Sequence, residues 1–388
     1  MGNPVDGLRL PAFGALFDVL PLCMLSNIFF NVYLFKCFMS AKNPKICEVC
    51  KKASVISLEY GPHYFCAKHF TRFFDNRIRK TIRKYSLLKR GEKILVALSG
   101  GKDSTVVLYI LQKYYSKSHN IEAIIIDEGV KGYREKAISS AIKNCKTWKI
   151  KYNVISFEKE FGITNDTLMP VLEANKKLGG TCAFCGTLRR NIMNKYAKKY
   201  KADKLVTGHN LDDEVQSFVM NVFNNDFNRM KRMGATAGII DHEGFVKRIK
   251  PLYETPEKEI IAYCAYNDLP HYGEECCPYS WTAKRNEFRE MLNTFENRFP
   301  GTEFSILRFY EELKKELKIS NTSKKEMEAK LHPCNQCGEP TEKDFCKACE
   351  LIDIIKKEKK QTKSNKKSLT DSKKYNKKLT CSTTKGTK

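Results

Sequence analysis

The sequence has no convincing membrane-spanning segment. Its longest uncharged stretch, Val19–Phe35, has 17 residues, which is the lower limit for crossing a bilayer, and Pro21 interrupts it. No small-residue cleavage site follows, and a second methionine, Met39, stands just before the first cysteines. We expect residues 1–38 to be an extension that is disordered or not native, and we expect no membrane partner. A genuine anchor is the alternative.

Acidic residues are much fewer than basic residues in this sequence. The 388 residues include 69 lysines and arginines against 44 aspartates and glutamates, which gives a net charge of +25. Residues 354–388 hold 13 lysines and two acidic residues, and their Lys/Ser/Thr/Asn composition predicts disorder. The excess of basic over acidic residues in the rest of the chain favours a polyanionic partner such as a nucleic acid. A solvated, lysine-rich surface is the alternative.

The 16 cysteines do not follow the pattern of a secreted disulfide scaffold, because most of them stand in close pairs within a large chain. Such pairs are typical of metal sites in intracellular proteins, so we predict a cytoplasmic location. Two groups have the spacing of closed tetrahedral zinc sites, which are structural rather than catalytic. The first group is Cys47, Cys50, Cys66 and His69, and the second is Cys334, Cys337, Cys346 and Cys349.

Strand-like and helix-like segments alternate through the middle of the chain. This pattern predicts an α/β fold, a Rossmann-like parallel sheet with helices on both faces, flanked by the two zinc modules. We also expect a basic helix from residue 71, a helix over 188–200 and a helix over 293–318. The predicted domains are an extension (1–38), an N-terminal zinc module (39–72), a main domain (73–290), a helical segment (291–330), a C-terminal zinc module (331–352) and a basic tail (353–388).

The stretch SGGKDS, residues 99–104, falls between the first strand and its helix, where open parallel sheets bind ligands. Glycines there let the backbone approach an oxyanion, and a helix N-terminus offers free N–H groups to a phosphate. It is not a Walker loop, because Val96 replaces the first glycine of that pattern and Asp103 replaces its hydroxyl residue. A plain glycine turn would not explain the lysine, the aspartate and two serines together.

This loop resembles the signature of the pyrophosphate-loop ATPases, which adenylate their substrates. Four further motifs resemble the tRNA 2-thiolation branch of that superfamily, and they are IDEGVKGYR (126–134), CAFCGTLRR (182–190), TGHNLDDE (207–214) and EECCPYS (274–280). The resemblance covers roughly residues 45–350. It implies an adenine nucleotide alpha hydrolase-like fold and an ATP-dependent tRNA sulfurtransferase, with ATP and Mg²⁺ as cofactors and tRNA as partner. The zinc modules would then serve folding and tRNA docking.

The resemblance also implies roles for single residues. Asp127 would meet the ribose or the ATP-bound metal, although capping a helix is the alternative reading. Arg189 would contact the phosphates, and Asp213 would lie near the reacting nucleotide. The nucleotide-binding set is Ala97, Ser99, Gly100, Gly101, Lys102, Asp103, Ser104, Asp127, Arg189 and Gly208, and the catalytic set is Asp213, Cys182 and Cys185.

Cys182 and Cys185 have no second pair nearby, which leaves two interpretations. They form a redox dithiol that carries sulfur, or they supply two ligands of an iron–sulfur cluster and EECCPYS supplies the third. The resemblance implies a 4Fe-4S cluster on three cysteines, with one iron open to a sulfur species. Pro278 restricts the preceding residue to an extended conformation, so we favour Cys277 over Cys276 as the third ligand.

The predicted function is ATP-dependent 2-thiolation of a tRNA uridine, in which adenylated O2 is replaced by sulfur. DEGVKGYR and residues 224–234 look more like the wobble-uridine group, and a T-loop uridine is the alternative. The sulfur donor is expected to be a ubiquitin-like thiocarboxylate carrier or free sulfide. We expect a homodimer or pairing with a related subunit. A non-catalytic RNA-binding module and an amide transferase are weaker alternatives, because neither explains the spare cysteines.

Overall fold

The structure is a computed structural model that describes residues 45–175, 180–237, 244–273, 277–316 and 331–358. The extension over 1–38, Cys276 and the tail beyond residue 358 lie outside the described residues, so the expectations about them stay predictions.

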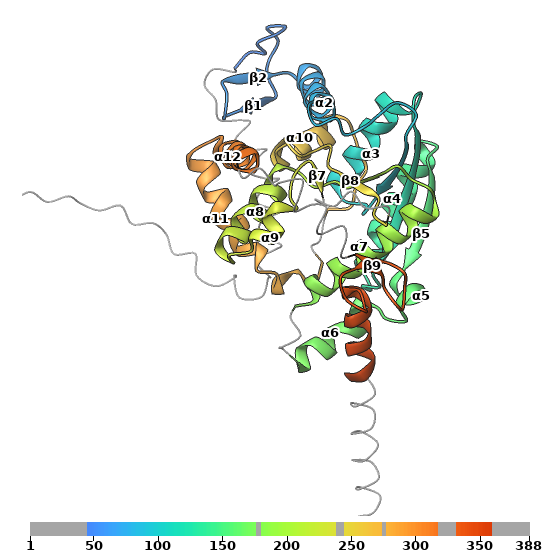
Figure 1. The fold of residues 1–388 in the computed structure, drawn as a ribbon. Helices are drawn as coiled ribbons and strands as arrows, with labels where there is room; N and C mark the ends of the chain where they lie inside the picture. Colours follow the sequence, from blue (N-terminus) through green and yellow to red (C-terminus); the bar gives the residue numbers. More distant parts are fainter. Residues whose placement is uncertain (1–44, 176–179, 238–243, 274–276, 317–330, 359–388) are drawn as a thin grey trace, which may run out of the picture.

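Six short strands form the central sheet (Figure 1). They are β3 (Lys93–Ala97), β4 (Asn120–Asp127), β5 (Lys151–Ser156), β6 (Lys204–Val206), β7 (Thr236–Ala237) and β8 (Lys247–Ile249). Their order across the sheet is β5-β4-β3-β6-β8-β7. The first five run parallel, which confirms the predicted parallel sheet, and β7 pairs antiparallel with β8 at the edge.

Helices cover both faces of the sheet, as the alternating pattern predicts. The helices packed on one face are α3 (Lys102–Tyr115), α4 (Arg134–Thr147), α8 (Leu211–Phe223) and α10 (Glu257–Tyr266). Those on the other face are α5 (Phe157–Phe161), α6 (Asn165–Ala174) and α7 (Thr181–Lys199). Successive strand side chains point to opposite faces, so Ile94 and Val96 join the first core and Leu95 joins the second.

The N-terminal module is a hairpin followed by a long helix. Its elements are β1 (Ile56–Leu58), β2 (His63–Phe65) and α2 (Ala67–Lys84). Phe70, Phe74, Ile78 and Ile82 recur every four residues along α2 and are all buried, because that spacing places them on one face. This face packs on α10, where the rings of Phe74 and Tyr263 stack with centroids 4.1 Å apart.

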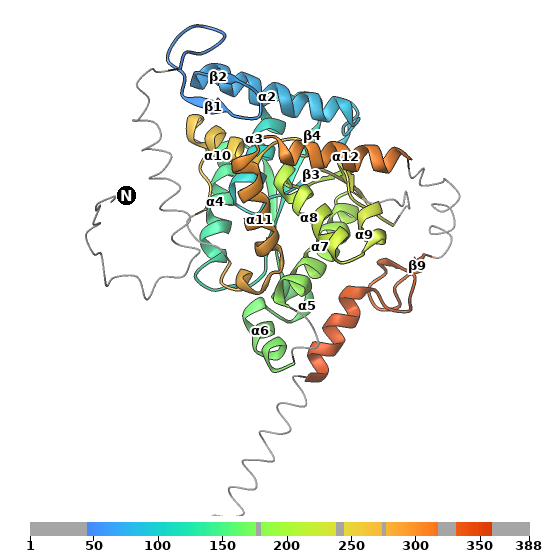
Figure 2. The ribbon, with the colours of Figure 1, turned by 90° about the vertical axis from the view of Figure 1, so that its left-hand side faces the viewer.

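The helical segment differs from the single helix expected over 293–318. The structure has the short η2 (Ser280–Thr282), then α11 (Arg285–Arg298) and α12 (Thr302–Glu316), which both pack against α8 (Figure 2). The break falls at Pro300, which has no N–H to donate, and at Gly301, whose φ of +94° ordinary side chains avoid. The short α9 (Phe227–Lys231) follows α8.

The C-terminal module packs on the face of the sheet that α7 covers. It consists of the small hairpin β9 (His332–Pro333) and β10 (Pro340–Thr341) and a helix over 347–358. Leu351, Ile352 and Ile355 join the core that also contains Leu188 and Ile192 of α7. The two modules therefore lie at opposite ends of the molecule (Figures 1 and 2).

Candidate functional site

The SGGKDS stretch forms a turn between β3 and α3 that its own side chains hold together. Ser99 Oγ lies 3.0 Å from Ser104 Oγ and accepts a hydrogen bond from the Gly101 N–H. Gly100 has a φ of +91°, and a Cβ at this position would lie 2.1 Å from the carbonyl oxygen of Ala137. Only glycine fits there, so α4 is as close to the loop as the backbone allows.

The loop after β6 packs directly on the SGGKDS turn (residues 99–104), which we call the nucleotide loop after its predicted ligand. Val96 pairs with Val206, so the segments after Ala97 and after β6 leave the sheet at the same edge. A Cβ on Gly208 would lie 2.7 Å from the backbone nitrogen of Ser104. Position 208 must therefore be a glycine, because a side chain there would clash with the first turn of α3. The sequence did not predict this contact between Gly208 and α3. Contact of Gly208 with a nucleotide stays a prediction.

Lys102 and Asp103, the charged residues of the loop, are already paired. Lys102 Nζ lies 2.5 Å from Glu257 Oε1 and 3.3 Å from Asp103 Oδ2. Burial alone would lower the pKa of Lys102, but the two carboxylates raise it above the ordinary lysine value, so the ammonium stays charged. Burial raises the pKa of Asp103, and the side-chain N–H of Asn210 donates to its Oδ1 over 3.0 Å.

The paired acids at the start of α8 differ in their surroundings. Burial would raise the pKa of Asp213, but His209 and Arg285 hold it below the usual range. Burial drives His209 toward its neutral form, with a pKa of about 4, so Arg285, 3.2 Å away, is the partner that matters at neutral pH. Asp212 accepts the Glu257 N–H instead, and burial raises its pKa to about 7.

The end of β4 approaches the nucleotide loop through a buried arginine. Asp127 Oδ1 accepts the Gly129 N–H over 2.9 Å, which fixes the turn after the strand. Arg134 pairs with Glu128 at 2.5 Å and donates to the Ser99 carbonyl oxygen at 2.6 Å. Arg134 is 5% exposed, so this bond tethers the nucleotide loop to the turn after β4 from inside the protein.

A cavity of about 180 Å³ joins the nucleotide loop to three cysteines. Ser99 and Gly101 form part of its wall, and Cys182, Cys185 and Cys277 form another part. The first two cysteines lie in the opening turns of α7, which begins seven residues before the helix expected from the sequence. The structure therefore brings together thiols that are far apart in the chain.

Arg189 lies between the cysteines and the acidic end of β4. The Cys185 thiolate raises the pKa of Arg189, and Glu128, Cys182 and Cys277 act in the same direction. One guanidinium nitrogen lies 3.7 Å from Glu128 Oε1, and Arg189 also lines the cavity. The Arg189 guanidinium can therefore interact with the cavity cysteines when they are ionised, and also with an anion that enters the cavity from the nucleotide loop.

The donor set of the cavity suits an iron–sulfur cluster with three protein ligands. Burial raises the pKa of Cys185 above the ordinary thiol value, and Arg189 and the 3.3 Å hydrogen bond from Asn165 Nδ2 offset only part of this shift. Of the cysteines that the structure describes, only Cys182, Cys185 and Cys277 line this cavity. Three cysteines can ligate three irons of a four-iron cluster and leave the fourth without a cysteine ligand.

The residues that the sequence reasoning missed include Arg134, Glu257 and Arg285. Arg134 stood inside a recognised motif, but nothing in the motif shows that its side chain turns inward to Ser99. Glu257 and Arg285 reach the site from α10 and α11 and lie outside every motif. No local sequence signal marks them, because only the tertiary packing brings these helices to α3 and α8.

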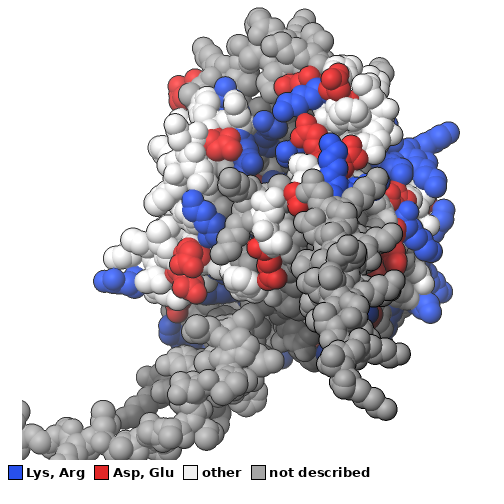
Figure 3. Space-filling view, turned by 90° about the horizontal axis from the view of Figure 1, so that it is seen from below, with Lys and Arg blue, Asp and Glu red and all other residues white. Residues whose placement is uncertain are grey.

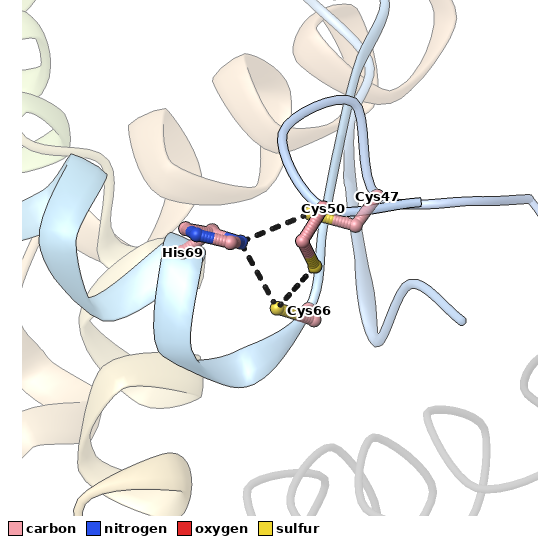
Figure 4. A group of neighbouring side chains, drawn as sticks. All are labelled: Cys47, Cys50, Cys66 and His69. Atoms are coloured by element: carbon pink, nitrogen blue, oxygen red, sulfur yellow. Dashed lines mark hydrogen bonds between the residues drawn. The ribbon is translucent and has the colours of Figure 1, made fainter. Parts of the chain in front are cut away.

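The N-terminal module brings its four predicted metal ligands together (Figure 4). His69 Nδ1 lies 3.4 Å from Cys47 Sγ and 3.3 Å from Cys66 Sγ, and Cys50 Sγ lies 3.7 Å from Cys66 Sγ. Although burial opposes it, hydrogen bonds from backbone N–H groups and from His69 lower the pKa of Cys47 to about 6. Ligand atoms this close, with an ionised thiol among them, suit a tetrahedral metal ion.

The C-terminal module also brings its four predicted ligands within 4.8 Å of one another. Cys337 Sγ lies 3.5 Å from Cys346 Sγ, and the Cys346 N–H donates to Cys334 Sγ over 3.2 Å. The buried Glu339 accepts a hydrogen bond from Asn194 of α7 at 2.6 Å. This metal-type cluster is therefore fixed to the same helix that carries Cys182 and Cys185.

Among the helices that the structure describes, none combines the length and apolarity needed to cross a bilayer. The PP-loop domain family matches residues 69–295 of the chain. This range begins within α2 and includes the nucleotide loop, all three cavity cysteines and most of α11.

Two relatives and one solved structure show what the chain is similar to. The tRNA 2-thiolation protein NcsA of Haloferax volcanii is 35% identical over 80% of this chain and 98% of its own length. The tRNA-5-methyluridine(54) 2-sulfurtransferase of Pyrococcus horikoshii is also 35% identical, over 80% of this chain and 94% of its own. A structure of the U34-tRNA thiolase NcsA from Methanococcus maripaludis with its [4Fe-4S] cluster matches with a TM-score of 0.67 and 32% identity, over 79% of this chain and 95% of that one. This chain belongs to the PP-loop family of tRNA 2-thiolation proteins.

Proposed function

We propose that the protein replaces O2 of a tRNA wobble uridine by sulfur at the expense of ATP. The observation that carries the proposal is the single cavity that joins the nucleotide loop to Cys182, Cys185 and Cys277. An activation site and a sulfur site must open on one space, because the activated base cannot leave the protein between the two steps without meeting water.

In the first step, O2 of the uridine attacks the α-phosphorus of ATP and pyrophosphate leaves. The N–H groups at the start of α3 would bind the phosphates, and Lys102 and Arg189 would offset the charge that develops. Asp103 and Asp127 would hold the Mg²⁺ that accompanies ATP, and Asp213 would lie near the reacting base. Oxygen is a poor leaving group from a pyrimidine, which is why O2 must first be adenylated.

In the second step, sulfur adds to C2 and the C2–O2 bond breaks, so AMP leaves with O2. Cys182, Cys185 and Cys277 would hold a 4Fe-4S cluster, whose remaining iron can bind a sulfur species. The NcsA structure that this chain matches is described with such a cluster, which supports this assignment. Without a cluster, Cys182 and Cys185 would act as a redox dithiol, and this route would need a donor that already holds sulfur at the persulfide oxidation level, such as a cysteine persulfide. The outer sulfur of a Cys182 persulfide would add to C2 as AMP leaves, and Cys185 would then attack the inner sulfur, releasing the thiolated base and leaving a Cys182–Cys185 disulfide.

A strongly basic chain suits tRNA as substrate. Figure 3 shows one face of the molecule, where lysines and arginines gather along one edge and acidic residues are interspersed over the rest. Two zinc ions would stabilise the folds of the terminal modules. The T-loop uridine is the second candidate substrate, because the Pyrococcus enzyme named for position 54 is as similar to this chain as the Haloferax protein is.

Further parts of the proposal concern the cellular setting. We place the protein in the cytoplasm, with a ubiquitin-like thiocarboxylate carrier or free sulfide as donor. We also propose that it works as a homodimer or with a related subunit. A donor of either kind supplies sulfur already in the sulfide oxidation state, so the replacement of oxygen by sulfur needs no further electrons.

The test is thiolation of unmodified tRNA by the anaerobically reconstituted protein with ATP and sulfide, followed by mass spectrometry of mapped nucleosides. We expect 2-thiouridine at the wobble position. A product at the T-loop would move the assignment to the second candidate, and no product with any tRNA would overturn the function. Ser99→Ala and Asp103→Ala should fold and bind tRNA but release no pyrophosphate.

The sulfur site is tested separately by iron content and cluster absorbance. Cys182→Ala and Cys277→Ala should lose iron and thiolation, whereas Cys276→Ala, the matched control, should keep both. Iron loss in the Cys276 variant with normal iron in the Cys277 variant would reverse the ligand assignment. If the variants of Cys182 and of both adjacent cysteines bind iron normally, the dithiol interpretation replaces the cluster.

A further inference from the structure

The cation of the nucleotide loop faces carboxylates rather than open space. Lys102 Nζ is 2.5 Å from Glu257 and 3.3 Å from Asp103, and the lysine side chain is only 22% exposed. Opposite charges this close in a partly buried place attract each other much more strongly than in water. A phosphate that enters the loop must therefore compete for this ammonium group.

Glu257 keeps its position without help from Lys102. It is the first residue of α10 and follows Pro256, and its backbone N–H donates to Asp212 Oδ2 at 2.8 Å. Helices α10 and α3 pack against each other, which carries the Glu257 side chain across to the loop. A side chain of the same shape without charge would leave the backbone bond to Asp212 intact.

The surroundings of Lys102 are crowded with negative charge. Three carboxylates, Asp103, Asp213 and Glu257, interact electrostatically with this lysine or with one another. Arg285 pairs with one of them, Asp213, at 3.2 Å. Burial, Asp213 and Glu257 together raise the pKa of Asp103, which reports this crowding. A site for a polyphosphate would bind more tightly without Glu257, so the carboxylate must serve a step other than binding.

We propose that Glu257 is a positioning residue that holds the Lys102 ammonium when no nucleotide is bound and gives it up to the phosphates when ATP binds. This inference rests on the proposed function, since it takes the loop to bind ATP. Lys102 remains charged and close to the loop throughout, and only its partner changes. After catalysis Glu257 takes the ammonium back, which weakens the hold on pyrophosphate and favours its release.

The test is Glu257→Gln, which keeps the size of the side chain and removes the competing charge. We expect ATP to bind this variant roughly five- to tenfold more tightly in calorimetry, a coupling typical of two interacting charged groups. Steady-state pyrophosphate release should show a lower KM for ATP together with a lower kcat. A purely structural role would change the melting temperature instead, so thermal unfolding is measured on the same samples.

The coupling to Lys102 is tested by a double-mutant cycle. Lys102→Met should weaken ATP binding, and adding Glu257→Gln to Lys102→Met should change it little, because the shared partner is gone. Glu254→Gln is the matched control, because Glu254 lies three residues earlier and pairs with Lys84 instead. We expect this control to bind ATP like the unmodified protein.

Unchanged or weaker ATP binding by Glu257→Gln would overturn the proposal. Full tightening in the Lys102→Met background would overturn it as well, because Glu257 would then repel the phosphates directly rather than through Lys102. Failure of the unmodified protein to bind ATP is a different result, and it would overturn the proposed function itself.

Discussion

At the scale of single residues, the nucleotide loop depends on a glycine that two separate constraints require. Gly100 has a left-handed backbone conformation, and its missing side chain makes room for the Ala137 carbonyl oxygen. Gly91 has nearly the same φ, +88°, but a Cβ there would meet nothing within 4 Å. Substituting each of these two glycines therefore distinguishes two costs. Gly91 reports backbone strain alone, and Gly100 reports backbone strain together with the steric clash.

We predict that Gly91→Ala lowers the free energy of unfolding by about 1 kcal/mol, the usual cost of a non-glycine residue at positive φ. Gly100→Ala should cost roughly 3 kcal/mol or more, because α4 or the loop must also move. The Gly100→Ala variant should also lose ATP binding, because Gly100 is part of the nucleotide loop. Urea denaturation and calorimetry measure both effects, and equal losses in the two variants would show that the contact with Ala137 is unimportant.

A pair of buried carboxyl groups predicts how stability depends on pH. Burial raises the pKa of Glu303 to about 9, with Asp212 and Glu296 adding to the shift, and burial raises that of Asp212 to about 7. Both values exceed the roughly 4 of an unfolded chain, so the folded protein holds more protons between these limits. The stability that they contribute is complete below about pH 4 and is lost as pH rises from there through the folded pKa values of about 7 and about 9.

We therefore expect these two groups to make the melting temperature fall from about pH 4 to about pH 9, most steeply below about pH 7, where both contribute. Glu303→Gln should remove much of this fall, because an amide stays neutral throughout. Glu290→Gln, at an exposed position on α11, is the control and should follow the unmodified protein. A Glu303 variant whose melting temperature falls just as steeply would mean that other groups set the pH dependence.

At the scale of elements, the sequence predicted the features that local patterns encode. Strand-like segments that alternate with helix-like ones marked all five parallel strands, and paired cysteines marked both groups of possible metal ligands. The expected helix over 293–318 was wrong at Pro300 and Gly301, where two breakers in succession outweigh the helical spacing on either side. The early start of α7 was missed because Cys182 and Cys185 were read as a motif rather than as helix.

The residues that complete the site could not be found in this way. Glu257 and Arg285 act on Lys102 and Asp213, which are 155 and 72 positions away in the chain. Periodicity and spacing carry no information about such pairs, because they arise only when the helices have packed. The sequence therefore pointed to residues that the structure brings to the cavity, but not to the charged residues that pair with them.

The C-terminal module predicts an effect that passes from one element to another. Cys346→Ser removes one of four closely grouped ligands, so zinc content should fall from about two ions per chain to about one. The helix over 347–358 should then release the face of α7 that it covers, and the melting temperature should drop by several degrees. Cys182→Ser should keep both zinc ions, and zinc loss from that variant would contradict the assignment.

At the scale of the whole molecule, charge should govern the affinity for tRNA. Lysine and arginine contacts release phosphate counterions, so the logarithm of the affinity should fall linearly with the logarithm of salt concentration. Residues 72–93, which include most of α2, should contribute to this slope. Filter binding at several salt concentrations measures it, and a salt-independent affinity would contradict a phosphate-dominated interface.

The tail is expected to add only weak, non-specific binding. Removing residues 359–388 should reduce the salt slope and leave wobble-uridine thiolation at physiological salt close to that of the full chain. The truncation leaves the described helix over 347–358 in place, so the C-terminal module is not disturbed. Abolished thiolation at physiological salt would show that the tail takes part in productive binding.

The spacing of the cysteines along the chain also sets an order of biogenesis. The possible metal ligands of the N-terminal module lie within 22 positions of one another, so that module could bind the proposed zinc ion as soon as it leaves the ribosome. The wall formed by Cys182, Cys185 and Cys277 is complete only after the sheet, α7 and the segment before η2 have come together. If the proposed cluster forms here, an iron donor that arrives during synthesis would find two thiols without the third, so the proposal places cluster insertion after the chain has folded.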